Sequence, residues 1–265
     1  MSVAAEAKLT NIIQEGYLGQ RLNPQPGEPL YLVLSDLLLS LRPLASSLPL
    51  RILDLGCGGS PYRSLFPNSL YHRADIAGVE NLDFEIPTDR PQWQLPAEEG
   101  SYDLVLSSQV LEHVLDPMSY LEEAFRLVKP GGRLVLSTHG MFEDHGCPYD
   151  FRRWTSDGLT ADLKSVGFQA IQMSKLTTGP RAALFILQQH RQSCSKRHSL
   201  GLWMAWLKWM LRHRRASFDR QCDASYSKHR VVSDHLADHK IYIGLLAVAS
   251  KPLAIRSAPI VRPIG

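Results

Sequence analysis

Two carboxylates and a glycine turn stand at the ends of the first two apolar runs of the chain. Asp54 is followed by Gly56 and Gly58, and Asp75 closes the next apolar run. Glycine lets a backbone approach a ligand closely, because it has no Cβ. A carboxylate after the second run can accept hydrogen bonds from ribose hydroxyls. Asp54 would repel a pyrophosphate and attract an ammonium or sulfonium group, so the pattern predicts a site for a cationic nucleoside.

A dinucleotide site is the alternative for the same turn. The fingerprint of such a site is G-x-G-x-x-G, whose third glycine packs the following helix on the sheet. In this chain that position is Pro61. A nicotinamide-dependent oxidoreductase therefore stays open as the weaker interpretation.

Histidines follow a later apolar run, on the side of the sheet where a substrate would lie. His139 and His145 come after residues 133–138. Because histidine titrates near neutral pH, either residue could take a proton from a hydroxyl acceptor, and we predict a catalytic role for both. Hydrogen bonding within the loop is the alternative for each. His113 is expected to pack or cap locally, and an Asp150–Arg153 ion pair is expected to shape the loop.

The elements that must position these residues alternate between strand and helix. Apolar runs at 50–55, 70–74, 82–84, 102–107, 133–138, 168–174 and 241–250 predict strands. Helical spacing is found at 30–44, at 111–127 with a break at Pro117, and at 155–166. This order predicts an α/β, doubly wound, mostly parallel sheet with helices on both faces. Residues 179–240 form a long insertion, expected to be helical, before the last strand.

Residues 50–140 resemble class I S-adenosylmethionine-dependent methyltransferases, particularly the type 11 branch. The matching motifs occur in the family's order: Leu53-Asp54-Leu55-Gly56-Cys57-Gly58, Asp75-Ile76, Leu95-Pro96, Tyr102-Asp103-Leu104-Val105, Val110-Leu111-Glu112-His113-Val114 and Leu127-Val128-Lys129-Pro130-Gly131-Gly132. The resemblance implies S-adenosylmethionine as the cofactor and a seven-stranded sheet with an antiparallel last strand.

The resemblance also implies roles for single residues at the cofactor site. It places Asp54, Gly56 and Gly58 around the methionine part, Asp75 at the ribose, Ile76, Gln94 and Leu95 at the adenine, and Ser107 and Gln109 at the sulfonium end. Ser60 stands where family members usually have a third glycine. The usual acid shortly before Leu95 is also missing, since Trp93 and Gln94 precede it directly. The residue that meets the adenine amino group therefore stays open.

Charge is unevenly distributed along a chain whose formal net charge is +3. The stretch from Leu163 to Phe218 holds basic residues and no acidic one. Within it, residues 200–215 combine tryptophans with a basic end and are too short to cross a bilayer. An interfacial helix on anionic lipid, a lid over the active site and a homodimer contact all fit this segment. Nucleic acid is disfavoured as a partner, because no Asp-Pro-Pro-Tyr or Asn-Pro-Pro-Tyr motif follows residues 102–107.

The expected organisation follows from these elements. Residues 1–48 would form N-terminal helices, 49–178 with 241–253 the cofactor-binding core, 179–240 the insertion on the acceptor side, and 254–265 a tail. No pair of cysteines or cysteine–histidine cluster has zinc spacing, so no metal site is expected. The cysteine usage and the absence of a signal peptide predict a cytoplasmic location, with contact at the inner face of a membrane left open.

The predicted function is methyl transfer from S-adenosylmethionine to a small-molecule, sugar or lipid-linked acceptor. The sulfonium is already activated, so such a protein mainly aligns donor and acceptor and excludes water. A module that binds the cofactor without transferring its methyl group is the second hypothesis, since the sequence shows no obvious base.

Overall fold

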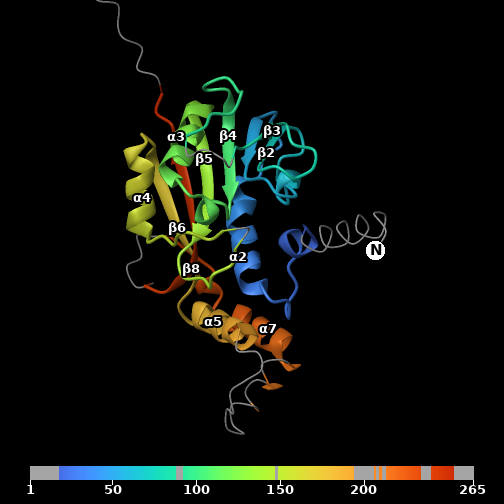
Figure 1. The fold of residues 1–265 in the computed structure, drawn as a ribbon. Coiled ribbons are helices and arrows are strands. Elements are labelled where there is room, and N and C mark those ends of the chain that lie inside the picture. The colour runs from blue at the N-terminus through green and yellow to red at the C-terminus, as the bar shows by residue number, and fades with distance from the viewer. Residues whose placement is uncertain are drawn as a thin grey trace, which may run out of the picture.

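An eight-stranded sheet forms the centre of the computed structural model (Figure 1). The structure describes residues 18–87, 92–146, 149–193, 206, 209–210, 213–233 and 240–253. The strands are β1 (Arg51–Leu55), β2 (Leu70–Asp75), β3 (Phe84–Glu85), β4 (Tyr102–Ser108), β5 (Val128–His139), β6 (Gln169–Thr178), β7 (Val231–Ser233) and β8 (Tyr242–Ser250). Their order across the sheet is β3-β2-β1-β4-β5-β8-β6-β7.

The sheet is parallel on one side and antiparallel on the other. β1 pairs in parallel with β2 and β4, and β4 pairs in parallel with β5. β8 lies antiparallel between β5 and β6. The predicted α/β class, with an antiparallel last strand, is confirmed. β7 adds an eighth strand inside the segment expected to be helical, and its three residues are too few to give a periodic signal.

Helices cover both faces of the sheet. They are α2 (Tyr31–Leu41), α3 (Pro117–Leu127), α4 (Ser156–Ser165), α5 (Gly179–Ser193) and α7 (Arg215–Ser225), with 3₁₀ turns η1 (Arg42–Leu44), η2 (Arg63–Leu65), η3 (Leu111–His113) and η4 (Ser227–His229). α3 and α4 pack in the larger apolar core, and α2 packs on the opposite face. The side chains of Asp116 and Thr155 cap the N-termini of α3 and α4, next to the predicted break at Pro117 and at the start of the helix predicted from residue 155.

The insertion is anchored to α2 by apolar packing and by a buried ion pair. Phe185 of α5 and Cys222 of α7 pack against Leu32 in one core cluster. The fully buried guanidinium of Arg181 donates to both carboxylate oxygens of Asp36, at 3.0 and 2.8 Å. α5 and α7 therefore lie together beyond the carboxyl ends of β4 and β5, which is the edge where a ligand would bind (Figure 1).

No helix among the described residues is long and apolar enough to cross a membrane. The Trp-rich segment 200–215 lies largely outside the described residues. Trp206 and Trp209, which are described, have 54% and 56% of their surface exposed. Contact of this segment with a membrane or with a second chain stays a prediction, as does the proposed division of the chain into segments.

Candidate active site

A cavity of about 710 Å³ opens at the carboxyl ends of the parallel strands. Its volume lies in the range of small-molecule sites. It is lined by strand-end residues Asp54, Asp75, Ser108 and His139 together with side chains from α2 and from α5. The insertion thus contributes directly to the wall, through Gln189.

The glycine turn after β1 has one packed side and one open side. A Cβ on Gly56 would lie 2.4 Å from Cγ1 of Val110, so no side chain fits there. A Cβ on Gly58 would meet no atom within 4 Å, and its φ is +48°. Since Gly58 lines the cavity, its bare Cα leaves room for a ligand to approach the backbone. The turn fits a group such as S-adenosylmethionine.

Asp54 is a largely buried carboxyl group in the wall of the cavity. Its Oδ2 accepts a hydrogen bond from the Tyr71 hydroxyl at 2.8 Å. Burial raises the pKa of Asp54 to about 7, although the hydrogen bond from Tyr71 and the charge of Arg73 oppose the shift. At neutral pH the carboxyl is therefore close to half ionised, and a cationic ligand nearby would favour the charged form.

Asp75 is held rigidly between β2 and the glycine turn. Its two carboxylate oxygens accept backbone N–H groups from Gly58 at 2.6 Å and from Ile76 at 2.7 Å. Because a carboxylate oxygen has two lone pairs, each keeps one for a ligand hydroxyl. This geometry fits the predicted contact with a ribose.

Arg73 explains why the turn works without a third glycine. Its Nε donates to Oγ of Ser60 at 2.8 Å, and its Nη2 donates to the carbonyl of Gly58 at 2.6 Å. Ser60 has a φ of +51°, a left-handed conformation that glycine would adopt more easily. The hydrogen bonds from Arg73 hold the serine in place. Sequence reasoning missed this residue, because it lies inside β2 and carries no motif.

Most of the residues predicted at the cofactor line the cavity. Asp54, Gly56, Gly58, Asp75, Ile76 and Gln109 all belong to its wall. Gln109 has a φ of +55° and accepts a hydrogen bond from Nη1 of Arg21 at 3.0 Å. Arg21 also lines the cavity and was not predicted, because it lies well outside the matching motifs.

Three of the predicted residues do not line this cavity. Leu95 is buried, and its backbone N–H donates to Glu123. Ser107 is fully buried, with its hydroxyl 2.8 Å from that of Tyr120. Gln94 lines a second, separate cavity. Trp93, which directly precedes Gln94, lines both cavities.

Histidines line the opposite end of the cavity, and one of them contacts a buried glutamate. Nε2 of His139 lies 3.0 Å from Oε1 of Glu112, and both side chains are almost fully buried. The His139 ring stacks on Phe142 with ring centroids 4.1 Å apart. Burial alone would raise the pKa of Glu112, but the contact and charge of His139 outweigh it and lower the pKa. Glu112 is therefore poised to stay ionised and to stabilise a cation beside it.

His145 also lines the cavity, from the loop after β5. Burial, followed by the charge of His139, lowers the pKa of His145, so it is neutral at pH 7. The Asp150–Arg153 pair is present, with Arg153 Nη1 donating to Asp150 at 2.5 Å, and Asp150 accepts the backbone N–H of His145 at 2.8 Å. The ion pair thus shapes the loop that carries His145.

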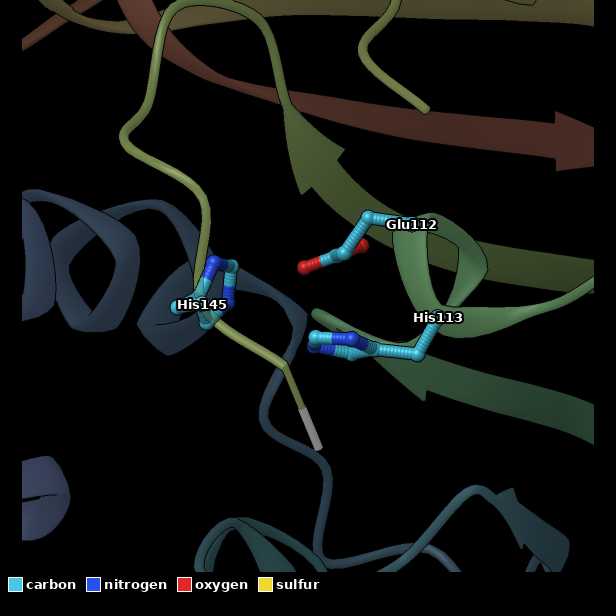
Figure 2. Close-up of side chains that lie close together, drawn as sticks. All are labelled: Glu112, His113 and His145. Carbon is cyan, nitrogen blue, oxygen red and sulfur yellow. The ribbon is translucent and has the colours of Figure 1, made fainter. Parts of the chain in front are cut away.

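His113 lines the same end of the cavity, whereas the sequence predicted that it would only pack or cap locally. Its Nδ1 lies 2.6 Å from the carbonyl oxygen of Tyr149. Figure 2 shows His113, His145 and the Glu112 carboxylate pointing toward one another. The adjacent residues Glu112 and His113 gave a hint of this cluster in the sequence. His145 lies 32 residues after His113, and no known spacing of metal ligands connects the two.

The wall between the histidines and α2 is largely apolar. It includes Leu30, Val33, Leu34 and Phe142. Gln189 is the polar exception, since its buried Oε1 has no hydrogen-bond donor among the residues that the structure describes. This end of the cavity suits a molecule with an apolar body and a hydrogen-bond donor.

A model of the methyltransferase domain family matches residues 28–222, well over half of the chain. The chain belongs to this methyltransferase family. This membership confirms the resemblance in the motifs, and the nicotinamide alternative is set aside.

Curated relatives match a shorter part of the chain. The ubiquinone biosynthesis O-methyltransferase of Cereibacter sphaeroides is 35% identical over 115 residues, which cover 37% of this chain and 45% of that protein. The protein of the same name from Roseobacter denitrificans is 36% identical over 115 residues, with the same coverage. The chain thus spans less than half the length of the curated relatives it matches.

Solved structures cover more of the chain at lower identity. Phosphoethanolamine N-methyltransferase 2 of Haemonchus contortus, in complex with S-adenosyl-L-methionine, has a TM-score of 0.49 at 17% identity and covers 92% of this chain and 57% of that one. A methyltransferase of Thermotoga maritima has a TM-score of 0.49 at 15% identity and covers 92% and 97%.

Proposed function

We propose that this methyltransferase methylates an oxygen atom of a small hydroxylated acceptor, and that His139 receives the acceptor's proton. The observation that carries this proposal is the environment of the His139 ring. Its Nε2 faces Glu112, and its buried Nδ1 has no hydrogen-bond partner in the described part of the chain. His139 also lies in the wall of the cavity.

A hydroxyl acceptor must lose its proton as its oxygen is methylated. When bound, S-adenosylmethionine supplies a methyl group that its sulfonium already activates. Nδ1 of His139 accepts the hydroxyl proton, and the resulting imidazolium forms an ion pair with Glu112. Glu112 is a positioning residue in this scheme, because it acts through His139. His145 is the second candidate for the base, since it is neutral and lies 5.0 Å from His139 between ring centroids.

The cofactor would be held at the other end of the cavity. Asp54 and Gly58 would face its methionine part, Asp75 would bind its ribose hydroxyls, and Ile76 would contact its adenine. Gln109 would border the sulfonium end. Trp93 is the side chain best placed to take over the adenine contact that the sequence assigned to Gln94 and Leu95.

The acceptor is proposed to be a hydroxylated ring compound with an apolar substituent. Support comes from the apolar wall formed by Leu30, Val33 and Phe142, and from the names of the curated relatives, which are O-methyltransferases of ubiquinone biosynthesis. The amide oxygen of Gln189, which has no hydrogen-bond donor among the described residues, would accept a hydrogen bond from such an acceptor. Sugar and lipid-linked acceptors are the competing outcomes of a substrate panel.

Kinetics on the His139→Ala variant test this proposal. Purified protein is incubated with S-adenosylmethionine and a panel of hydroxylated aromatic, sugar and lipid-linked compounds, and formation of S-adenosylhomocysteine is measured. With an accepted compound, we expect the substitution to lower kcat by about 100-fold or more, the usual contribution of a general base, and to leave cofactor affinity unchanged. His213→Ala, which alters an exposed histidine outside the cavity, is the matched control. Equal kcat values for the wild type and the His139→Ala variant would exclude His139 as the base.

A further inference from the structure

Glu112, His113 and His145 converge on one point, and the two histidines line the cavity (Figure 2). One donor atom from each residue lies within 4.8 Å of the donors of the other two. Glu112 and His113 come from η3, and His145 comes from the loop after β5. Two imidazoles and a carboxylate form a familiar set of metal ligands, which leaves coordination positions for water or a substrate.

We propose that these three residues bind a divalent transition-metal ion. The hydrogen bonds of the two histidines support this proposal. Nδ1 of His113 lies 2.6 Å from the carbonyl oxygen of Tyr149, and Nδ1 of His145 lies 3.2 Å from that of Glu143. A carbonyl oxygen only accepts, so each Nδ1 carries the proton and each Nε2 keeps its lone pair. Metal-binding histidines are oriented in the same way, by a second hydrogen bond to a carbonyl or carboxylate.

Glu112 supplies an independent argument for a cation. The side chain is fully buried, and Oε2 accepts a hydrogen bond from Thr138 at 2.8 Å. Oε1 lies 3.0 Å from Nε2 of His139. A buried carboxylate needs compensating charge, and a metal ion would supply it in addition to the contact with His139. Figure 2 shows the Glu112 carboxylate directed toward the two histidines.

The donor set indicates which ions would bind. Imidazole nitrogens favour zinc, iron, cobalt or nickel, whereas magnesium and calcium prefer oxygen ligands. Bonds of about 2.0–2.2 Å require donor atoms roughly 3–3.5 Å apart, so the site must contract by about 1 Å or more on binding. The imidazole of His145 can supply that movement, because 36% of its side chain is exposed and its loop has no regular secondary structure.

The ion would also assist the removal of the acceptor's proton, and this part of the inference rests on the proposed function. An open coordination position facing the cavity would bind the oxygen of the acceptor. A metal-bound hydroxyl loses its proton more easily, so the proton would pass to His139 at lower cost. The metal site would then select acceptors that carry an oxygen donor.

Metal binding by the tag-free full chain, without cofactor or acceptor, tests the site separately from the reaction. Titration calorimetry with Zn²⁺ and visible absorption of added Co²⁺ are the two readouts. We expect one equivalent per chain in the wild type. The His145→Ala and Glu112→Gln variants should each bind at least ten times more weakly, since even residues behind the ligands contribute 10- to 100-fold to affinity. His213→Ala should bind as the wild type does.

Two results would overturn the proposal. One is no binding by the wild-type chain, and the other is equal affinity in the wild type and the His145→Ala variant. Thermal unfolding without metal shows whether each variant is folded. If the Glu112→Gln variant fails to fold, the His145→Ala variant decides the question alone, because its side chain is partly exposed. If the metal binds but methyl transfer does not depend on it, the site stands and only its catalytic role fails.

Discussion

The affinity for S-adenosylmethionine should depend on pH through Asp54. Burial raises the pKa of this carboxyl to about 7, from an ordinary value of 3.8. A sulfonium or ammonium group favours the ionised carboxylate, so a proton on Asp54 competes with the cofactor. The affinity for the cofactor should therefore reach its maximum well above pH 7, where Asp54 is ionised, and should fall as the pH drops through 7.

The size of the effect follows from the fraction of Asp54 that is ionised before binding. With a pKa of about 7, roughly nine tenths of the carboxyl is ionised at pH 8 and roughly one tenth at pH 6. The dissociation constant should therefore rise by about tenfold between pH 8 and pH 6, which corresponds to about 1.4 kcal/mol. The hydrogen bond from Tyr71 favours the charged form and keeps the pKa of Asp54 from rising further.

Titration calorimetry at pH 6, 7 and 8 measures this dependence. The Asp54→Asn variant is the essential control, because it removes this carboxyl and keeps the other side chains of the cavity. We expect the variant to bind weakly at every pH, with a nearly constant dissociation constant. A flat profile for the wild type would refute the reasoning, and so would a tenfold change that persists in the Asp54→Asn variant.

Three substitutions test other parts of the structure. Gly58→Ala should weaken cofactor binding at least tenfold in calorimetry, because its methyl group would enter open space in the cavity; unchanged affinity would contradict the fit. Gly56→Ala should instead lower the free energy of unfolding in urea by about 1–3 kcal/mol, because its Cβ would overlap Val110, and a neutral result would show that the turn relaxes. Asp36→Asn should lower the free energy of unfolding by about 3–5 kcal/mol in the same assay, because it leaves the buried Arg181 poorly paired. A loss below about 1 kcal/mol would show that this ion pair contributes little to holding the insertion on α2.

The strands around the cofactor end could be predicted because their residues repeat a simple pattern. β1 and β4 are buried along most of their length, and such strands of a parallel sheet read as continuous hydrophobic segments. β2 is only partly buried, and its prediction depended on Asp75 at its end. The glycine turn could be located for the same reason, since it interrupts one of these runs. Six of the nine predicted cofactor residues line the cavity, and all six stand at strand ends or directly after them.

Features that depend on tertiary packing could not be predicted. β7 has only three residues and exists because β6 offers it an edge to pair with. The hydrogen bond from Arg73 to Ser60 comes from a side chain within β2, and the residue pattern of a strand does not predict the partner of such a side chain. The approach of His145 to Glu112 depends on the course of the loop after β5, which the Asp150–Arg153 ion pair shapes.

A crystal structure with S-adenosylhomocysteine bound is the most direct test of the central claim that one cavity holds the cofactor at its acidic end and the acceptor at its histidine end. We predict that Asp75 hydrogen-bonds the ribose, that the amino acid part lies against Gly58 and Asp54, and that the sulfur faces the space beside His139. A nucleoside bound outside this cavity, or one whose sulfur faces away from His139, would contradict the account.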